Sequence, residues 1–420
     1  MTGERQVDIL IIGGGPAGLA AAIAAREAGC QSILVADREE APGGILKQCI
    51  HAGFGLHTFE EELTGPEYAK RYIDKANALG IEIQCGAMVV ELSGEKRAMI
   101  VSREKGLEIV QAKAVILAMG CRERPRGSLA TPGSRCAGIY TAGTAQKLVN
   151  RKGLTPGKRV VILGSGDIGL IMARRMTFIG AKVLACVELM PYSAGLARNI
   201  VQCLNDFDIP LYLSHTVVDI HGEGRLEGVT IAQVDAALKP MPGTERRLDC
   251  DTLLLSVGLI PENELTRMAG VSLSPATSGA EVDEALETSA EGVFACGNVL
   301  HVHDLVDFVS EEAAHAGRSA AAYVSGVRRR RGSIPVLAGN GAAGPVPQFI
   351  SRDVTEPVRL MFRPRGVYKN AKVIVERDGK PLVEKRSMIF TPGEMVSLTL
   401  EPALLRGGDS PLTVRMEEKA

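Results

Sequence analysis

The feature that most constrains the fold is a unit that occurs twice in the chain. One copy begins at Val7 and reads VDILIIGGGPAGLAAAIAAREAGCQSILVADRE, and the other begins at Lys158 and reads KRVVILGSGDIGLIMARRMTFIGAKVLACVELM. Each copy runs from an apolar strand through G-x-G-x-x-G into a helix with small residues, and then through a second strand to an acid. The glycines and the acid recur at the same spacing in both copies.

This order of elements has a physical reason. The first glycine makes a tight turn, the second lets a pyrophosphate approach the backbone, and the third lets the helix pack closely on the strand. The start of the helix then faces the phosphates. Asp37 and Glu188 lie 19 residues beyond the last glycine of their copies, where a carboxylate binds ribose hydroxyls. The repeat predicts two dinucleotide sites, and the alternative is two glycine-rich turns that bind nothing.

Composition narrows the class of protein. A chain of 420 residues suggests two or three domains, and 48 basic against 49 acidic residues create no field that recruits nucleic acid or anionic membrane. The basic run 328–331 is either a solvated linker or, less favoured, a docking site. Acidic Glu4 and Asp8 precede a short apolar run, which is unlike a signal peptide, and no apolar run is long enough to span a membrane. Nine cysteines without a C-x-x-C pair favour a reducing cytoplasm.

Three further strand ends complete a pattern. They are AKAVILAMGCRERP at 112–125, CDTLLLSVGLIPEN at 250–263 and TSAEGVFACGN at 288–298. With the repeat, they make the chain resemble the two-dinucleotide-binding-domain flavoproteins, the class that contains thioredoxin reductase and NADH-dependent flavin reductases. The resemblance implies an α/β fold of two Rossmann-like domains, with an NAD(P) domain at 123–261 inserted into an FAD domain at 1–122 and 262–327.

The resemblance also implies which residues hold each cofactor. The expected FAD contacts are Gly13, Gly15, Pro16, Ala17, Gly18, Asp37, Gly44, Gln48, Val89, Ala118, Gly120, Gly297 and Asn298. The expected contacts for the nicotinamide nucleotide are Gly164, Gly166, Asp167, Ile168, Gly169, Glu188 and Gly258. Glu188 is followed by Leu-Met-Pro-Tyr and not by arginines, and an acid repels a 2′-phosphate, so NAD is preferred to NADP.

One position departs from the resembled pattern. Asn298 stands where these flavoproteins usually carry an aspartate, so we expect a ribityl contact without the negative charge. A helix should follow through Val324, capped by Asp304 or Asp307. The resemblance implies that the start of this helix faces the pyrimidine end of the flavin, where its positive end favours anionic reduced flavin. His301 and His303 suggest a metal, but an H-x-H loop without thiolates is more often structural, and we expect no metal.

The redox disulfide of the resembled reductases has no counterpart here. The stretch YTAGTAQ at 140–146 contains no cysteine, and GGILKQCIHAGFG at 43–55 offers Cys49 alone. We therefore expect no electron relay through a disulfide of this chain. Cys49 and His51 are candidates for proton exchange beside the flavin. The alternative, which we favour, is that Cys49 is an apolar filler and His51 a hydrogen-bonded loop residue. The segments 48–57 and 301–307 are the expected surface around that exchange.

A closer resemblance lies in GGILKQCIHAGFG, GCRERPR and GIYTAGTAQ. These stretches are similar to amino-acid- and opine-oxidising flavoprotein subunits, to cyanide synthase and sarcosine oxidase chains, and to bacterial oxidoreductases associated with glycerol-3-phosphate oxidation. The resemblance implies a small-molecule substrate, and as partners a second flavoprotein dehydrogenase or a cysteine-rich electron-transfer protein. Three functions stay open: a reductase that exchanges hydride with NAD(H), an oxidase or dehydrogenase subunit, and an electron-transfer or scaffold subunit that is inactive alone.

The C-terminal region has a different pattern. Residues 328–347 are rich in glycine, alanine and proline and predict a linker. Segments with period-2 alternation follow at 358–363, 371–376, 383–390, 395–400 and 412–416, and RDGK at 377–380 predicts a hairpin. A small antiparallel sandwich at 348–420 is expected, which serves either docking and oligomerisation or stabilisation alone. No cysteine follows Cys296, so any iron–sulfur step must use another polypeptide.

Overall fold

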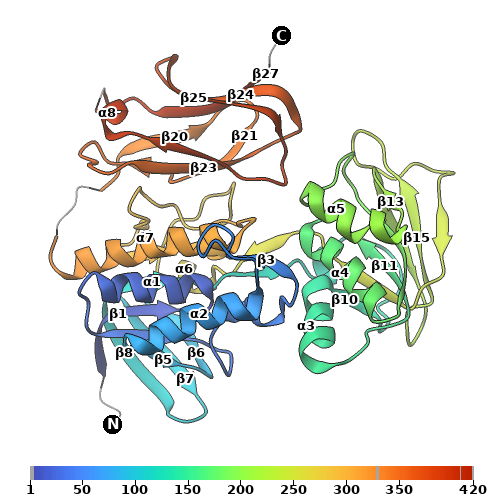
Figure 1. Cartoon of the computed structure of the whole chain (residues 1–420), viewed down its shortest axis with the longest axis horizontal. Coiled ribbons are helices and arrows are strands. Elements are labelled where there is room, and N and C mark those ends of the chain that lie inside the picture. The colour runs from blue at the N-terminus through green and yellow to red at the C-terminus, as the bar shows by residue number, and fades with distance from the viewer. Residues whose placement is uncertain (1–3, 328–330, 407, 419–420) are drawn as a thin grey trace. The chain divides into compact units, whose positions relative to one another are not determined.

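The structure is a computed structural model that describes residues 4–327, 331–406 and 408–418 (Figure 1). Two compact units divide the chain, the first made of Met1–Cys121 with Pro261–Ala420 and the second of Arg122–Ile260. The second unit is therefore an insertion in the first. The C-terminal sheets, expected as a separate domain at 348–420, group with the first unit. The expected α/β class, with two dinucleotide-binding folds and a C-terminal β region, is confirmed.

The core of the first unit is a seven-stranded sheet in the order β5-β2-β1-β8-β7-β6, with β19 also paired to β8. Strands β5, β2, β1, the second half of β8 and β19 run parallel, and β6 and β7 add an antiparallel ribbon. The central stretches of the parallel strands, at 9–12, 33–36, 114–117 and 293–295, are apolar and buried. Their bounds are β1 (Arg5–Ile12), β2 (Ile33–Ala36), β5 (Glu82–Gln84), β6 (Ala87–Leu92), β7 (Arg97–Ser102), β8 (Gly106–Leu117) and β19 (Val293–Ala295).

Helices α1 (Pro16–Glu27) and α7 (Val306–Val324) lie side by side in this unit (Figure 1). Both are rich in alanine and contain one glycine each, and a Cβ at Gly317 would lie 2.2 Å from the carbonyl oxygen of Ala21. The small residues therefore set how closely the helices approach. The remaining elements here are η1 (Gly44–Gln48), β3 (Ala52–Phe54), β4 (Leu63–Thr64), α2 (Gly65–Ala78), α6 (Glu264–Met268) and η4 (Gly297–Val299).

The second unit repeats the parallel design on a smaller scale. Its five-stranded parallel sheet has the order β10-β17-β11-β12-β13, and a three-stranded antiparallel sheet, β14-β15-β16, accompanies it. The strands are β10 (Ile139–Thr141), β11 (Arg159–Leu163), β12 (Lys182–Val187), β13 (Leu211–Tyr212), β14 (His215–His221), β15 (Gly228–Gln233), β16 (Arg246–Leu248) and β17 (Thr252–Leu255). The helices are α3 (Ala142–Lys152), α4 (Asp167–Phe178) and α5 (Ala197–Cys203), and the short strands β9 (Cys121–Glu123) and β18 (Leu259–Pro261) lie where the chain enters and leaves.

The C-terminal region consists of two small sheets around their own apolar core. One sheet has the order β22-β20-β27-β24-β25 and the other β21-β23-β26, and every pair except β20 with β27 is antiparallel. The bounds are β20 (Ile334–Ala338), β21 (Ala342–Val346), β22 (Phe349–Ile350), β23 (Val358–Pro364), β24 (Tyr368–Arg377), β25 (Lys380–Phe390), β26 (Val396–Leu400), β27 (Leu412–Glu418) and the short helix α8 (Pro402–Leu405). The hairpin expected at 377–380 joins β24 to β25.

Two local expectations were wrong. The predicted linker at 328–347 contains β20 and β21, because alternating apolar side chains there complete the C-terminal core despite the nearby glycines. Helix α7 begins after Leu305 without a side-chain cap, since both aspartates expected as caps accept hydrogen bonds from other segments. Most of the basic run, 328–330, lies outside the described residues. No helix in the described part of the chain is long and apolar enough to cross a membrane.

Candidate functional site

The first glycine turn connects β1 to α1, and two of its glycines are required by the fold itself. Gly13 has φ +109°, and a Cβ there would lie 2.4 Å from the carbonyl oxygen of Ala118 on the neighbouring β8 strand end. A Cβ at Gly18 would lie 1.8 Å from the carbonyl oxygen of Gly13. These contacts let the start of α1 pack directly against the turn.

Gly15 has a different environment in the same turn. A Cβ at Gly15 would meet just one atom within 4 Å, the Cα of Gly44 at 3.8 Å. Helix α1 begins at Pro16, and no side chain caps it, so the N–H groups of Ala17 and Gly18 point from a helix start that carries positive partial charge. The space in front of Gly15 therefore suits the close approach of a pyrophosphate.

Asp37 follows β2 and is positioned by backbone hydrogen bonds. Its Oδ2 accepts the N–H of Gly14 at 2.6 Å and its Oδ1 accepts the N–H of Glu39 at 2.7 Å. The side chain is buried, with 6% of the residue exposed. An ionised carboxylate has about four acceptor positions. The two that these bonds leave can accept ribose hydroxyls beside the glycine turn.

The second glycine turn, between β11 and α4, has the same construction. Gly164 has φ +94°, and a Cβ there would lie 2.0 Å from the carbonyl oxygen of Ser256. Gly169 packs on Ser256 as well, with a Cβ position 2.8 Å from the serine Cβ, and its N–H donates to the serine Oγ at 3.1 Å. Gly166 precedes α4, which like α1 has no side-chain cap at its start.

Glu188 occupies the position in the second unit that Asp37 has in the first. Its Oε2 accepts both the N–H of Ser165 at 2.8 Å and the hydroxyl of Ser165 at 2.5 Å. Its Oε1 accepts the N–H of Met190 at 2.9 Å. The carboxylate is thus buried beside the turn and held by three hydrogen bonds, with acceptor capacity left for a ribose hydroxyl.

A segment of the second unit, which we call the covering segment (193–199), lies against its glycine turn. Asp167, in the first turn of α4, accepts the N–H of Leu196 at 2.9 Å and the side-chain amide of Asn199 at 2.6 Å through Oδ1. The hydroxyl of Ser193 donates to the carbonyl of Ser165 at 3.1 Å. Asp167 therefore serves the packing of this segment, a role that the repeat pattern did not predict.

The segment between β19 and α7, residues 296–305, leads the chain back to the first glycine turn, and we call it the return segment. Gly297 has φ +71°, and a Cβ there would lie 2.9 Å from the Cβ of Ala17 at the start of α1. The amide of Asn298 is engaged within the chain, because its Oδ1 accepts the N–H of His303 at 3.0 Å and its Nδ2 lies 3.6 Å from Cys121 Sγ. Asn298 thus shapes its own loop, a role that the expected ribityl contact did not include.

The other residues expected to contact a cofactor lie in different environments. Gly44 faces Gly15, Gln48 is buried in η1, and Gly120 follows β8 with open space beside its Cα. Val89 differs, because its side chain belongs to the apolar core of the first unit. Ile168 lies on α4, and Gly258, with φ +102°, accepts the N–H of Arg124.

Cys49 is placed as a packing residue. It is 8% exposed, and burial raises the pKa of its thiol to about 12, so the thiol is protonated at neutral pH. The thiol donates to the carbonyl of Ile45 at 3.4 Å. Gly65 packs against it, with a Cβ position 2.8 Å from the Cβ of Cys49. His51 is half-buried, and its ring lies 5.0 Å from that of Phe54.

The two segments expected around the electron exchange, 48–57 and 301–307, are brought together by Asp307. Its carboxylate accepts the N–H of Gly55 at 3.2 Å and that of Thr58 at 2.9 Å. One turn further along α7, Ser310 accepts the hydroxyl of Tyr68 at 2.8 Å. The start of α7 therefore anchors the loop that follows Cys49, a role that sequence reasoning missed because it assigned Asp307 to a cap.

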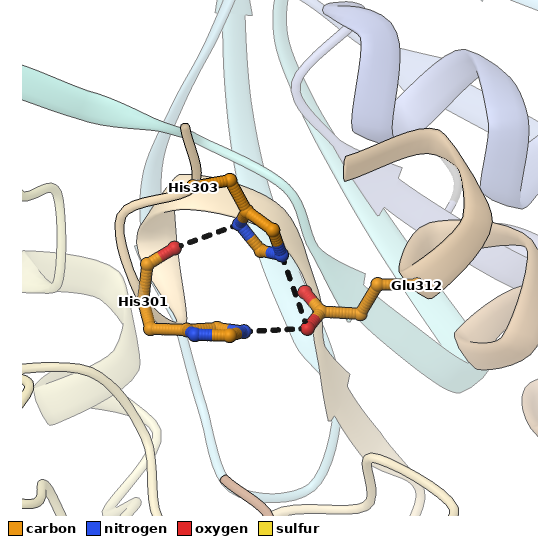
Figure 2. A group of neighbouring side chains, drawn as sticks. All are labelled: His301, His303 and Glu312. Carbon is orange, nitrogen blue, oxygen red and sulfur yellow. Dashed lines mark hydrogen bonds and ion pairs between the residues drawn. The ribbon is translucent and has the colours of Figure 1, made fainter. Parts of the chain in front are cut away.

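Figure 2 shows a second group that sequence reasoning missed, in which Glu312 of α7 points at His301 and His303. Glu312 Oε2 lies 2.5 Å from His301 Nε2 and 3.4 Å from His303 Nε2. Burial alone would raise the pKa of Glu312, but the two imidazoles hold it well below its usual range. A carboxylate nine residues after an H-x-H loop is the signal that could have revealed the group.

Comparison with known proteins agrees with this geometry. Residues 7–320 match the family model of the pyridine nucleotide-disulphide oxidoreductases. The chain is 27% identical to dihydrolipoyl dehydrogenase of Pseudomonas aeruginosa over 365 residues, 79% of this chain and 74% of that protein. It is 25% identical to an opine oxidase subunit of Agrobacterium tumefaciens over 289 residues, 63% of this chain and 55% of that protein.

Among solved structures, thioredoxin reductase of T. acidophilum superposes with a TM-score of 0.63 at 25% identity, and the match covers 76% of this chain and 99% of that one. The family match covers both glycine turns and the segment that returns after β19. The chain therefore belongs to the pyridine nucleotide-disulphide oxidoreductase family and is an oxidoreductase that binds FAD and a nicotinamide nucleotide.

Proposed function

We propose that this protein exchanges hydride between NAD(H) and FAD and passes electrons directly to or from a small molecule or a partner redox protein. The observation that carries the proposal is the equivalence of the two glycine turns. Each lies between a parallel strand and an uncapped helix, and each has a buried carboxylate that accepts the N–H of the second residue of the turn, Gly14 or Ser165. Two such turns in separate units suit two nucleotides with different roles.

FAD is assigned to the first turn. When bound there, FAD supplies the two-electron redox centre. The chain contributes the uncapped start of α1 for the pyrophosphate, Asp37 for a ribose, and the open position at Gly15 that admits the phosphates. Gly297 supports the assignment, because it brings the segment returning from β19 to Ala17 at the same helix start.

NAD rather than NADP is assigned to the second turn. Glu188 is buried, and the three groups that donate hydrogen bonds to it are two backbone N–H groups and one hydroxyl, all uncharged. None of these partners neutralises the negative charge of the carboxylate. A 2′-phosphate placed against it would meet a like charge at low dielectric, whereas ribose hydroxyls would donate to it.

Electrons are expected to leave without a disulfide of this chain. All nine cysteines are free thiols and all lie in the described part of the chain. The pKa of Cys49, the thiol nearest in sequence to Gly44, is raised by burial to about 12, which disfavours the thiolate that disulfide exchange requires.

Anaerobic stopped-flow spectrophotometry tests this function. NADH should bleach the flavin absorbance of the purified protein at least about tenfold faster than NADPH at equal concentration, a barrier difference of about 1.4 kcal/mol. Equal rates would remove the role assigned to Glu188. A flavin that neither nucleotide bleaches would shift the function to the second candidate.

The second candidate is a flavoprotein subunit that oxidises a small molecule, such as an amino acid, an opine or a glycerol-3-phosphate-linked substrate, together with partner chains. Its support is the similarity to the opine oxidase subunit and the exposure of three large apolar side chains, Ile45, Ile50 and Leu56, within a short stretch of the chain. Exposed large apolar side chains favour a protein contact when they form a patch. Substrate turnover that appears only when co-purified partners are added would favour this candidate over the self-sufficient reductase.

A further inference from the structure

We propose that His301, His303 and Glu312 form a binding site for one divalent transition-metal ion of the Zn²⁺ class. Such an ion would join the segment that returns from β19 to helix α7. The inference concerns the first unit alone and does not depend on the identity of the electron donor or acceptor.

The three side chains converge from two elements. His301 and His303 lie in the loop between η4 and α7, and Glu312 lies in the second turn of α7 (Figure 2). One donor atom of each residue lies within 4.8 Å of the others. All three side chains are at most 5% exposed. Three convergent nitrogen and oxygen donors that are removed from water are the usual protein contribution to a three-ligand zinc site.

Hydrogen bonds to the outer atoms of His303 and Glu312 leave one ring nitrogen and one carboxylate oxygen facing the centre of the three side chains. His303 Nδ1 lies 3.0 Å from the carbonyl oxygen of His301 and must donate to it, because a carbonyl only accepts. That bond leaves Nε2 of His303 as the ring nitrogen that faces Glu312, and Nε2 is buried without a hydrogen-bond partner among the described residues. Glu312 Oε1 accepts the N–H of Gly297 at 2.7 Å, which leaves Oε2 for the group. Metal ligands are typically oriented by such outer hydrogen bonds.

The distances define how the group would change on binding. Two ligands at about 2.0–2.1 Å from a tetrahedral ion stand about 3.3–3.4 Å apart. The 3.4 Å between His303 Nε2 and Glu312 Oε2 already has this value. The 2.5 Å between His301 Nε2 and Glu312 Oε2 is a hydrogen bond, so the ion would replace its proton and the ring would move outward by about 0.9 Å.

The donor set selects the class of metal. Two imidazoles and one carboxylate suit Zn²⁺, and also Fe²⁺, whereas Ca²⁺ and Mg²⁺ prefer oxygen ligands alone. The alternative occupant is a proton, which would make the group a buried ion pair between an imidazolium and Glu312.

The test is metal binding by the FAD-loaded protein. After treatment with a chelator and equilibration with Zn²⁺, elemental analysis should find one tightly held Zn²⁺ per chain. X-ray absorption at the zinc edge should show nitrogen and oxygen ligands with imidazole scattering and no sulfur. Tighter retention of Fe²⁺ under anaerobic conditions would support the same site with a different metal.

Variants separate this site from adventitious binding. His303→Gln should weaken Zn²⁺ binding by at least about 100-fold while the protein keeps its FAD, and Glu312→Gln should have the same effect if it folds. His215→Gln, which removes a partly exposed histidine of the second unit, is the matched control and should bind Zn²⁺ normally. Zinc retained by folded His303→Gln, a sulfur ligand shell, or no zinc in the folded wild-type protein would each overturn the proposal.

Discussion

The two glycine turns share their construction and differ in what holds the segment beside them. At the first turn, Asp37 accepts two backbone N–H groups, and the neighbouring return segment comes from far along the chain, through Gly297. At the second turn, Glu188 accepts three hydrogen bonds, and the covering segment that begins at Ser193 belongs to the same unit. Both turns thus pack on a distant strand end, at Ala118 and at Ser256. They differ in the additional segment beside them, which comes from far along the chain at the first turn and, at the second, lies 28 residues away at Ser193.

The return segment of the first unit is held in turn by the C-terminal sheets. Arg363 of β23 forms an ion pair with Asp304 and donates to the carbonyl of Val302 at 2.9 Å. Asp304 also accepts the N–H of Met395 at 2.6 Å. The C-terminal region therefore positions the loop before α7, in addition to any docking role. Stabilisation and positioning of the first site are the functions that these contacts favour for it.

The largest expected effect comes from adding a side chain at the middle glycine of each turn, where Gly15 is open and a Cβ at Gly166 would lie 3.3 Å from the Oγ of Ser256. Gly15→Val should lower FAD affinity by more than about 100-fold, or about 2.7 kcal/mol, because the new side chain occupies the space of the pyrophosphate and not space filled by the chain. Gly166→Val should leave the protein yellow but abolish its bleaching by NADH. Released flavin and stopped-flow absorbance measure the two effects. If Gly166→Val loses FAD and Gly15→Val keeps it, the assignment of nucleotides to turns is reversed.

A smaller effect is expected from removing the charge of one acid at a time. Glu188→Gln can still accept a hydrogen bond from Ser165 but no longer repels a 2′-phosphate, so the preference for NADH over NADPH should fall by about tenfold, or about 1.4 kcal/mol. Asp37→Asn is the matched control, because it should weaken FAD binding and leave the nucleotide preference unchanged. The ratio of the two flavin-reduction rates measures this, and an unchanged ratio in Glu188→Gln would contradict the assignment.

A substitution in the C-terminal sheets tests whether contacts from these sheets stabilise the segment before α7 without affecting the second glycine turn. Arg363→Ala should lower the free energy of unfolding of the first unit by about 1 kcal/mol, since the ion pair is partly exposed and a hydrogen bond to Val302 is lost. NADH affinity, which we assign to the second unit, should not change. Thermal unfolding followed by flavin fluorescence measures the loss, with Arg386→Ala on exposed β25 as the control. Equal melting temperatures for the two variants would argue against the positioning role.

The smallest effect is expected at Cys49. Because burial raises the pKa of its thiol to about 12, Cys49→Ser should change the rate of NADH-driven flavin reduction by no more than about threefold, or about 0.7 kcal/mol, between pH 6 and 8.

The raised pKa of the Cys49 thiol also predicts how the free energy of unfolding depends on pH. The neutral buried thiol favours folding fully below its unfolded pKa of about 8.5, and this contribution is lost as pH rises towards 12. Cys49→Ser should therefore lose less stability at alkaline pH, which denaturation at pH 8 and 10 would detect.

A slower half-reaction in Cys49→Ser with FAD still bound would show that the thiol is catalytic. Normal flavin reduction with turnover lost only in the presence of partner chains would instead place Cys49 on the partner side of the flavin.

Local sequence patterns determined much of this protein. The spacing of glycines and acids predicted both turns. A strand, a tight turn and a helix that follow one another in the chain contact each other locally, and these contacts require glycines and an acid at fixed positions in the sequence. The hairpin at 377–380 was also predictable from the sequence, because Asp-Gly favours the positive φ angles that a two-residue turn requires. Asp378 and Gly379 adopt φ angles of 50° and 74°. The alternating strands from Val358 onward followed from their buried faces.

Only the tertiary structure decided what the polar side chains of the return segment and of helix α7 do. Asp304, Asp307 and Glu312 each find partners 91, 249 and 11 residues away, respectively. From sequence, Asp304 and Asp307 were equally good helix caps, because a carboxylate that caps a helix and one that anchors a distant loop have the same local signature. The burial that holds Glu312 against two histidines, and keeps the thiol of Cys49 protonated, exists only once the core has closed around them.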